Sequence, residues 1–228
     1  MKVYWNMIQG SEEWHKYRYR RVGGTGVKSI MGSKGASALI DDILSAWCED
    51  FQHEEGYTSD DMQRGLDLEP IARQDVSAHF GKEFKEAGVI QSDLPILYVS
   101  PDGITEDLTE ATEIKCPSRI VHQRYIRENK IPTEYFWQCM NYFAVNPKLQ
   151  KLHFVSYRPE HRIPMFIKTI TRDEVIHFKK KQTVDEFANE IRLVAQQLQG
   201  LAVKELTRLA DDEFITFDST VQKFIGAC

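Results

Sequence analysis

The sequence lacks any long apolar segment. None of its apolar runs approaches the ~20 residues that a helix needs to cross a bilayer. The N-terminus, MKVYWNMIQGSEEW, also lacks the uninterrupted apolar stretch and the small-residue cleavage site of a secretory signal peptide. These absences argue against a helical membrane protein, and we expect a cytoplasmic protein with no membrane association.

Cysteine is scarce and scattered. The four cysteines, Cys48, Cys116, Cys139 and Cys228, contain no C-x-x-C pair, which argues against a zinc ribbon or an iron–sulfur site. Their spacing is typical of reduced thiols in the cytosol. The seven histidines likewise show no pair at metal-binding spacing.

Internal repeats, low-complexity tracts and linkers rich in proline or serine are also missing. We therefore expect a single domain over residues 1–228, with a core at about 10–172 and a C-terminal helical region at about 173–228. A hydrophobic content of 42% and a charged content of 28% are ordinary for a soluble globular protein.

A nucleotide-binding loop is absent as well. In the stretch GGTGVKS, Val27 separates Gly26 from Lys28, whereas the P-loop pattern G-x-x-x-x-G-K-[ST] requires glycine and lysine to be adjacent. The dinucleotide pattern G-x-G-x-x-G fails too, because Ser29 stands where the third glycine belongs. The glycine-rich loop therefore needs another explanation.

Basic residues are fewer than acidic ones, which gives a net charge of −5, but the basic residues are clustered. The clusters are KYRYRR at 16–21, HQRYIRENK at 122–130 and FKKKQ at 178–182. The first two alternate arginine with tyrosine, which suits contact with phosphates combined with stacking on bases. Each cluster taken alone is more typical of a solvated helix face than of a nucleic-acid site.

Periodicity and turn residues predict alternating helices and strands. We expect a helix from Ser11, a short helix after the glycine-rich loop with Thr25 as its N-cap, and a helical region at 58–81 that Pro70 kinks or divides. Further helices are expected at 36–51, 118–128, 133–145 and 173–199, and strands at 83–91, 96–100, 110–116, 151–158 and 164–172. This order predicts an α/β fold, of the α+β kind with a mixed sheet flanked by helices.

One stretch, ILYVSPDGITEDLTEATEIKCPSR, carries the chemistry. Glu113 and Lys115 have the i, i+2 spacing that places two side chains on the same face of a strand. A hairpin of this length can bring Asp102 of SPDG beside Glu113. Two adjacent carboxylates suit Mg²⁺ or Mn²⁺, and a lysine beside them can orient an attacking water. The alternative is purely structural: Asp102 only forms the turn, and Glu113 and Lys115 form a surface salt bridge.

Three other features accompany this stretch. Glu69 lies in QRGLDLEP, on or beside a helix that precedes the hairpin. Gln138 and Tyr142 have the i, i+4 spacing of one helix face. Arg18 precedes Thr25 by seven residues, at the start of the glycine-rich loop.

With these residues in place, the sequence resembles the lambda-exonuclease (YqaJ-type) family of phage recombination nucleases. The resemblance runs from about Trp14 to the Arg158 region and includes W-H-K-x-R, a small-residue loop, G-x-x-x-E, S-P-D-G, E-x-K-C-P and the glutamine helix, in that order. It implies a PD-(D/E)XK, restriction-endonuclease-like nuclease core. The last ~60 residues contribute little to this resemblance.

The resemblance also implies roles for particular residues. Asp102 and Glu113 would be metal ligands together with the backbone carbonyl of Ile114, and Lys115 would act on the nucleophilic water. Glu69 and Gln138 would complete the catalytic site, with Glu69 reaching the second metal or its water. The cofactor would be two Mg²⁺ ions per site, with Mn²⁺ as a possible replacement.

A second group of residues would bind the substrate. The resemblance implies that Arg18 grips a 5′ phosphate, that Thr25 replaces a family serine in the same pocket, and that Ser100 and Tyr142 assist substrate binding. The chain departs from the family here, because Gly23-Gly24-Thr25-Gly26 stands where Thr-Ala-Ser is frequent. Exposed N–H groups in such a loop still favour an anion.

The implied activity is Mg²⁺-dependent 5′→3′ digestion of double-stranded DNA ends, releasing mononucleotides and leaving a 3′ single strand for recombination by strand annealing. The family implies a toroidal homotrimer and a phage single-strand annealing protein as partner, in the cytoplasm of a bacterial host. Two alternatives stay open. A PD-(D/E)XK endonuclease of restriction or junction-resolving type would share the catalytic residues, and a DNA-binding module with a decayed site would show no metal-dependent activity.

Overall fold

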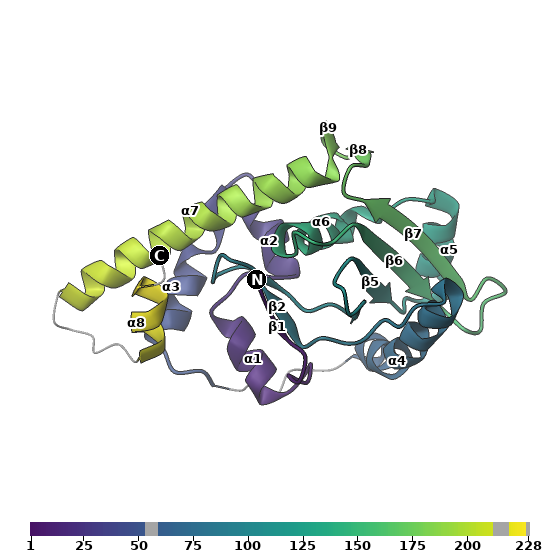
Figure 1. Ribbon diagram of the computed structural model, residues 1–228, viewed down its shortest axis with the longest axis horizontal. Coiled ribbons are helices and arrows are strands. Elements are labelled where there is room, and N and C mark those ends of the chain that lie inside the picture. The colour runs from purple at the N-terminus through teal and green to yellow at the C-terminus, as the bar shows by residue number, and fades with distance from the viewer. Residues whose placement is uncertain (53–58, 212–218, 227–228) are drawn as a thin grey trace.

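The computed structural model describes residues 1–52, 59–211 and 219–226 (Figure 1). The helices are α1 (Glu12–Tyr19), α2 (Thr25–Ile30), α3 (Ile40–Cys48), α4 (Asp60–Phe80), α5 (Arg119–Glu128), α6 (Phe136–Val145), α7 (Val184–Asp211) and α8 (Ser219–Gly226), with 3₁₀ turns η1 (Gly35–Ala38) and η2 (Thr133–Tyr135). The strands are β1 (Lys2–Tyr4), β2 (Val89–Gln91), β3 (Tyr98–Val99), β4 (Gly103–Ile104), β5 (Glu110–Lys115), β6 (Lys151–Tyr157), β7 (Met165–Thr171), β8 (Val175–His177) and β9 (Lys181–Thr183).

The central sheet is mixed, as expected. Its strand order is β4-β5-β6-β7, with β5 and β6 parallel and the other two pairs antiparallel. The expected strand at 96–100 does not join it. Instead, β3 pairs with β2 in a separate sheet of order β1-β2-β3, and the turn between β3 and β4 carries the chain into the central sheet. The expected strand at 83–91 is also shortened to β2.

Helices cover both faces of the central sheet (Figure 1). On one face, Ala72 and Val76 of α4 pack with Ile114 of β5. On the other face, Phe154 of β6 belongs to the larger core that includes Phe143 of α6 and residues of α7. Alternation along β5 therefore directs Ile114 toward α4 and sends its neighbours Glu113 and Lys115 toward the opposite layer.

Helix α4 is one uninterrupted helix of 21 residues, so the expectation that Pro70 divides it is wrong. A proline removes one backbone hydrogen bond but can be tolerated where packing holds the helix together. Pro70 lies on the exposed side, whereas Ala72 and Val76 are fully buried. The caps hold the two ends: Ser59 accepts a hydrogen bond from Met62 N, and Gly81 adopts a left-handed conformation with φ 60°. Residue 58, the first of the expected helical region, lies outside the described residues.

The expected helix at 173–199 is wrong in its first part. Residues 175–183 form the β8–β9 hairpin, in which Val175 and His177 are exposed and Ile176 is partly buried. Helix α7 begins only at Val184, because Thr183 and Glu186 form a reciprocal capping box: Glu186 N donates to Thr183 Oγ1 at 3.1 Å, and Thr183 N donates to Glu186 Oε2 at 2.7 Å. The helix then continues to Asp211, beyond the expected end.

At the N-termini of α1 and α2, one expectation from the sequence agrees with the structure and one does not. Ser11 caps α1 as expected, accepting a hydrogen bond from Trp14 N at 3.3 Å. Thr25 is the first residue of α2 and not its N-cap. That position belongs to Gly24, whose φ of 49° is a conformation that glycine adopts without strain.

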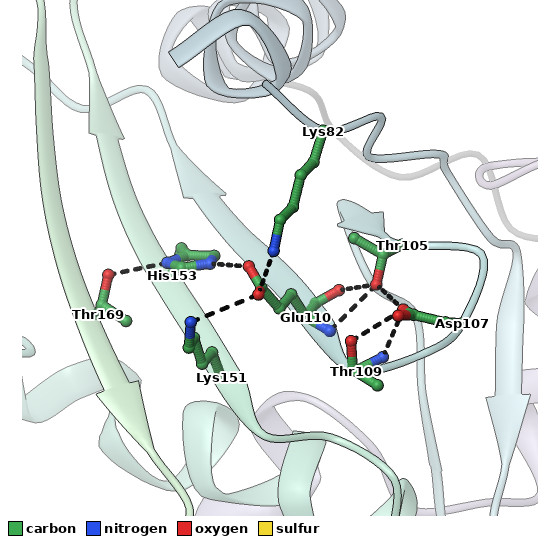
Figure 2. Close-up of polar contacts among 8 residues, drawn as sticks. All are labelled: Lys82, Thr105, Asp107, Thr109, Glu110, Lys151, His153 and Thr169. Carbon is green, nitrogen blue, oxygen red and sulfur yellow. Dashed lines mark hydrogen bonds and ion pairs between the residues drawn. The ribbon is translucent and has the colours of Figure 1, made fainter. Parts of the chain in front are cut away.

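A polar cluster fastens the start of β5 to the end of α4 (Figure 2). Glu110 is the centre of this cluster and accepts contacts from Lys82 Nζ at 2.5 Å, Lys151 Nζ at 3.5 Å and His153 Nε2 at 3.2 Å. The other ring nitrogen of His153 lies 2.8 Å from Thr169 Oγ1. The buried carboxylate is therefore paired on every side that the figure shows.

The C-terminal part of the described chain runs along one side of the molecule (Figure 1). Helix α7 packs on α6 and α3, and α8 folds back so that Phe224 stacks on Trp47 of α3 with ring centroids 4.3 Å apart. None of the described helices has the length and apolar character required to cross a membrane. Cys48, Cys116 and Cys139 are free thiols, and Cys228 lies outside the described residues.

Candidate active site

The β4–β5 hairpin brings Asp102 beside Glu113. Gly103 pairs with Thr112 in the antiparallel ladder, so the residue before Gly103 lies opposite the residue after Thr112. The backbone N–H of Ile114 donates a hydrogen bond of 2.6 Å to Asp102 Oδ2. This bond fixes the Asp102 carboxylate against β5, and the predicted fold-back of the hairpin is therefore confirmed.

Glu113 is fully buried and is held at both oxygens. Its Oε1 is ion-paired with Lys115 Nζ and accepts a hydrogen bond of 2.7 Å from Gln138 Nε2. Its Oε2 accepts a hydrogen bond of 2.7 Å from the hydroxyl of Tyr142. The i, i+4 spacing on α6 thus directs two donors at one carboxylate, as the sequence pattern predicted for a shared helix face.

Charge at the site is unbalanced. Burial raises the pKa of Asp102 well above its ordinary value, and the nearby charge of Glu113 raises it further. Burial alone would lower the pKa of Lys115, but the charges of Glu113 and Asp102 outweigh that effect and raise it. Lys115 is therefore a cation, and one cation faces two buried carboxylates.

Glu69 approaches the same site from α4. It lines a cleft of about 660 Å³ together with Lys115, and Tyr135 and Glu134 of η2 form part of the opposite wall. Burial raises the pKa of Glu69, while Arg73 one turn along the helix acts in the opposite direction. The lining of the cleft thus includes two acidic residues, Glu69 and Glu134, and two cationic ones, Lys115 and Arg124.

These donors suit a hard divalent cation. Carboxylate oxygens of Asp102 and Glu113, with the carbonyl oxygen of Ile114, are the ligand type that Mg²⁺ prefers, and a divalent cation there would favour the ionised form of both carboxylates. In the parts of the chain that the structure describes, no three acidic, histidine or cysteine side chains form a complete metal cage. Mg²⁺ does not need one, because it commonly takes one or two carboxylates and keeps several waters.

A second pocket, of about 440 Å³, contains Arg18 and Thr25. The Arg18 guanidinium is held in place on two sides: its Nε donates to the hydroxyl of Tyr98 at 2.8 Å, and its carbon lies 3.7 Å from the centre of the Trp14 ring. His15 and Arg21 also line the pocket. It therefore offers several cations and a hydroxyl to an anion.

Two residues predicted to assist substrate binding, Ser100 and Tyr142, do not line the pocket of Arg18 and Thr25. Tyr142 is buried against Glu113 and does not line the pocket of Arg18 and Thr25, so its placement among the 5′-phosphate residues is corrected. Ser100 accepts a hydrogen bond of 3.0 Å from Trp14 Nε1. It thereby connects α1 to the segment that leads into Asp102.

Sequence reasoning missed several residues around the site. Tyr98 holds Arg18 from 80 positions away, Arg73 contacts Glu69, and Tyr135 places its ring 5.3 Å from Lys115 Nζ. Only Arg73 carried a local signal, since it follows Glu69 by four residues on a helix. The others belong to distant segments that only the fold brings together.

Glu113 and Lys115 of β5 and Asp102, directly before β4, therefore meet in a mixed sheet flanked by helices, with a helical glutamine and a third acidic residue nearby. This combination defines the PD-(D/E)XK class of nucleases. Lys115 and Ile114 line the cleft, while Asp102 and Glu113 lie buried directly behind them.

Comparison with known proteins identifies the branch of that class. Residues 13–148 match the YqaJ-like viral recombinase domain, and the chain belongs to this family. No protein with a curated description matches the chain. The family and the fold together make the chain a DNA-hydrolysing nuclease.

Solved structures show the same fold. An alkaline exonuclease, LHK-Exo from Laribacter hongkongensis, is 26% identical with a TM-score of 0.67, covering 89% of this chain and 99% of its own. The same enzyme in complex with dAMP gives a TM-score of 0.66 at the same identity and coverage. A phage-related exonuclease from Haemophilus somnus 129PT is 13% identical, with a TM-score of 0.51 and coverage of 86% and 99%, and shows likeness of fold alone.

Proposed function

We propose that the protein is a Mg²⁺-dependent exonuclease that digests one strand of double-stranded DNA from a 5′ end and leaves a 3′ single strand for recombination by strand annealing. The observation that carries the proposal is the convergence of Asp102, Glu113 and Lys115 beside the cleft that Lys115 and Glu69 line. The likeness to an alkaline exonuclease supports it.

Asp102, Glu113 and the carbonyl of Ile114 would hold the metal, with Glu69 as a further ligand through a second ion or its water. Bound there, Mg²⁺ supplies Lewis-acid stabilisation of the phosphate and lowers the pKa of a coordinated water. Mn²⁺ uses the same oxygen ligands and can replace it. The two Mg²⁺ ions expected from the family remain part of the proposal.

The protein's own groups orient the reaction. Lys115, kept cationic by its carboxylate neighbours, donates hydrogen bonds to the attacking water and to the phosphate as negative charge develops there. Gln138 and Tyr142 hold Glu113 in one rotamer, so its carboxylate does not have to reorganise during the reaction. These contacts pre-form the site before DNA arrives.

The pocket of Arg18 and Thr25 supplies the end recognition. A guanidinium binds a phosphate through several N–H donors at once, and Tyr98 and Trp14 hold that of Arg18 at a fixed angle. We propose that this pocket binds the 5′ phosphate of the DNA end. Ser100 would contribute from the segment between this pocket and Asp102.

We further propose that the chain assembles as a toroidal homotrimer and acts with a phage single-strand annealing protein in the cytoplasm of a bacterial host. A ring is compatible with a net charge of −5, because basic residues can line the channel while acidic residues face outward. The proposed partner is the protein that loads onto the exposed 3′ strand.

Digestion of a linear duplex with and without a 5′ phosphate tests these proposals, in Mg²⁺ and in EDTA. The wild type should release mononucleotides in Mg²⁺ and act faster on the phosphorylated end. Lys115→Ala should abolish cleavage on both substrates. Arg18→Ala should reduce cleavage of the phosphorylated end to the rate of the unphosphorylated one.

Other results separate the alternatives. Cleavage of a covalently closed circle would indicate an endonuclease, and equal rates on both kinds of end would remove the 5′-phosphate pocket. Absence of metal-dependent cleavage on any DNA would mean a binding module whose carboxylates form a structural ion pair.

A further inference from the structure

Arg73 of α4 lies between two carboxylates. Its Nη2 is 3.3 Å from Glu69 Oε1, and its Nη1 is 2.7 Å from Glu86 Oε2. The Arg73 side chain is only 12% exposed, whereas that of Glu86 is 37% exposed. One planar guanidinium thus contacts Glu69 through one nitrogen and is itself held by Glu86 through another.

Glu86 is connected to the strand that follows Asp102. The preceding residue, Lys85, exchanges two backbone hydrogen bonds with Ile104 of β4, at 2.9 and 2.8 Å. Ile104 stands two positions after Asp102. The contact between Arg73 and Glu86 therefore ties α4, which carries Glu69, to the hairpin that carries Asp102.

The stem of Arg73 packs at the same place. A side-chain carbon on Gly103 would lie 3.5 Å from Arg73 Cγ, 3.1 Å from Phe84 Cβ and 2.7 Å from Thr112 Oγ1. Glycine beside Asp102 thus lets the Arg73 stem approach the hairpin closely. The long side chain serves as a spacer between helix and strand as well as an ion-pair partner.

We infer that Arg73 is a positioning residue for the metal site: with Glu86 as its anchor, it sets the Glu69 carboxylate at a fixed distance from Asp102 and Glu113. The inference rests on the proposed metal-dependent function. Groups that orient metal ligands commonly change metal affinity by about 10- to 100-fold when removed. Neither Arg73 nor Glu86 touches the metal or the DNA in this assignment.

The direct test measures binding of Mn²⁺ alone, without DNA, to the full chain by titration calorimetry. Arg73→Lys keeps the positive charge but loses the two-sided contact, and it should bind Mn²⁺ about tenfold more weakly than the wild type. Glu86→Gln removes the anchor at a partly exposed position and should weaken binding in the same direction by a smaller factor. Glu83→Gln is the matched control, since Glu83 contacts Lys85 and not Arg73.

A second readout separates positioning from a general structural role. In the nuclease assay, Arg73→Lys should need more Mg²⁺ for half-maximal activity and should regain the wild-type maximal rate in excess Mg²⁺. Circular dichroism and the thermal midpoint without metal should match those of Glu83→Gln.

Several results would overturn the inference. Mn²⁺ binding by Arg73→Lys and Glu86→Gln that equals or exceeds that of the wild type would show that Arg73 does not position a ligand. A loss of activity that excess Mg²⁺ cannot restore would assign Arg73 to the fold instead. A wild type that binds no Mn²⁺ but folds normally would remove the proposed metal site itself, and the inference with it.

Discussion

The hydroxyl of Tyr142 donates a hydrogen bond of 2.7 Å to Glu113 Oε2, and both side chains lie in the protein interior. Gln138, one helical turn earlier, donates to the other oxygen of the same carboxylate. Burial, followed by the charge of Glu113, raises the pKa of Tyr142 well above its ordinary value, so the phenol remains a donor. Helix α6 is thus a support for the catalytic strand and not part of the 5′-phosphate pocket.

Replacement of Tyr142 by phenylalanine should therefore impair catalysis and stability together. It keeps the ring but leaves a buried carboxylate oxygen without its donor, at a cost of about 1.5–3 kcal/mol for a hydrogen bond to a charged group. We expect kcat to fall roughly tenfold. Urea unfolding and single-turnover cleavage measure the two effects.

Tyr125→Phe is the matched control, because its hydroxyl contacts Glu134 and not Glu113. An unchanged kcat in Tyr142→Phe, combined with weaker binding of 5′-phosphorylated ends alone, would contradict the placement of Tyr142 at the catalytic carboxylate.

Tyr98→Phe should weaken recognition of the DNA end without affecting the chemical step. The variant removes the acceptor that Arg18 Nε uses at 2.8 Å and leaves the ring in place. Loss of one hydrogen bond to a charged group corresponds to roughly tenfold weaker binding of a 5′-phosphorylated end. KM should rise for phosphorylated ends only, as steady-state kinetics on paired substrates would show.

Tyr17→Phe provides the comparison, since its hydroxyl donates to Gln91 at 2.7 Å. Equal KM changes on phosphorylated and unphosphorylated ends would show that Tyr98 supports the fold and not the pocket.

The cluster around Glu110 predicts a pH-dependent stability (Figure 2). Burial lowers the pKa of His153, an effect that Lys151 and Lys82 reinforce and the contact with Glu110 partly offsets. The unfolded chain therefore binds more protons than the folded one as the pH falls below about 6.5, and the free energy of unfolding decreases there. Glu110 acts in the same direction at lower pH: burial would raise its pKa, but Lys82 and His153 outweigh this and lower it.

His153→Gln should flatten this dependence. Urea unfolding between about pH 8 and about pH 5.5 should show the free energy of unfolding of the wild type decreasing relative to that of the variant as the pH falls. A difference between the two proteins that does not change over this range would refute the prediction.

Phe224→Ala should destabilise the protein while leaving the active site intact. Phe224 is buried against Trp47, and removing its ring leaves a cavity, which costs about 3–5 kcal/mol for a large aromatic side chain. The thermal midpoint should fall clearly, and nuclease activity at a temperature where the variant is folded should stay near wild type. Lys223→Ala, at an exposed neighbouring position, should change neither. A midpoint unchanged by Phe224→Ala would mean that α8 adds little to the stability of the fold.

Local patterns predicted the hairpin, the helix face of Gln138 and Tyr142, and the cap at Ser11, because each depends on residues a few positions apart. The same reasoning was wrong at 173–183, where the spacing of apolar and charged residues predicted the start of a helix but the chain forms the β8–β9 hairpin. Thr183 and Glu186 carried the helix-start signal in the capping-box pattern T-x-x-E. The expected division at Pro70 was also wrong, since burial of Ala72 and Val76 holds the helix together beyond the proline.

By itself, the sequence predicted that Asp102, Glu113 and Lys115 lie together, because strand alternation and hairpin closure are short-range consequences of covalent geometry. Its motifs also carried the resemblance to the family to which the chain belongs. Only the tertiary structure decided which groups hold the predicted site residues in place. Tyr98 contacts Arg18, Tyr142 contacts Glu113, and Arg73 lies between Glu69 and Glu86. The first two join segments far apart in the chain, and the third depends on the loop that pairs with β4. Contacts between distant segments form only when burial of the two apolar layers brings those segments together, and only the contact between Arg73 and Glu69, four residues apart on α4, had a local signal.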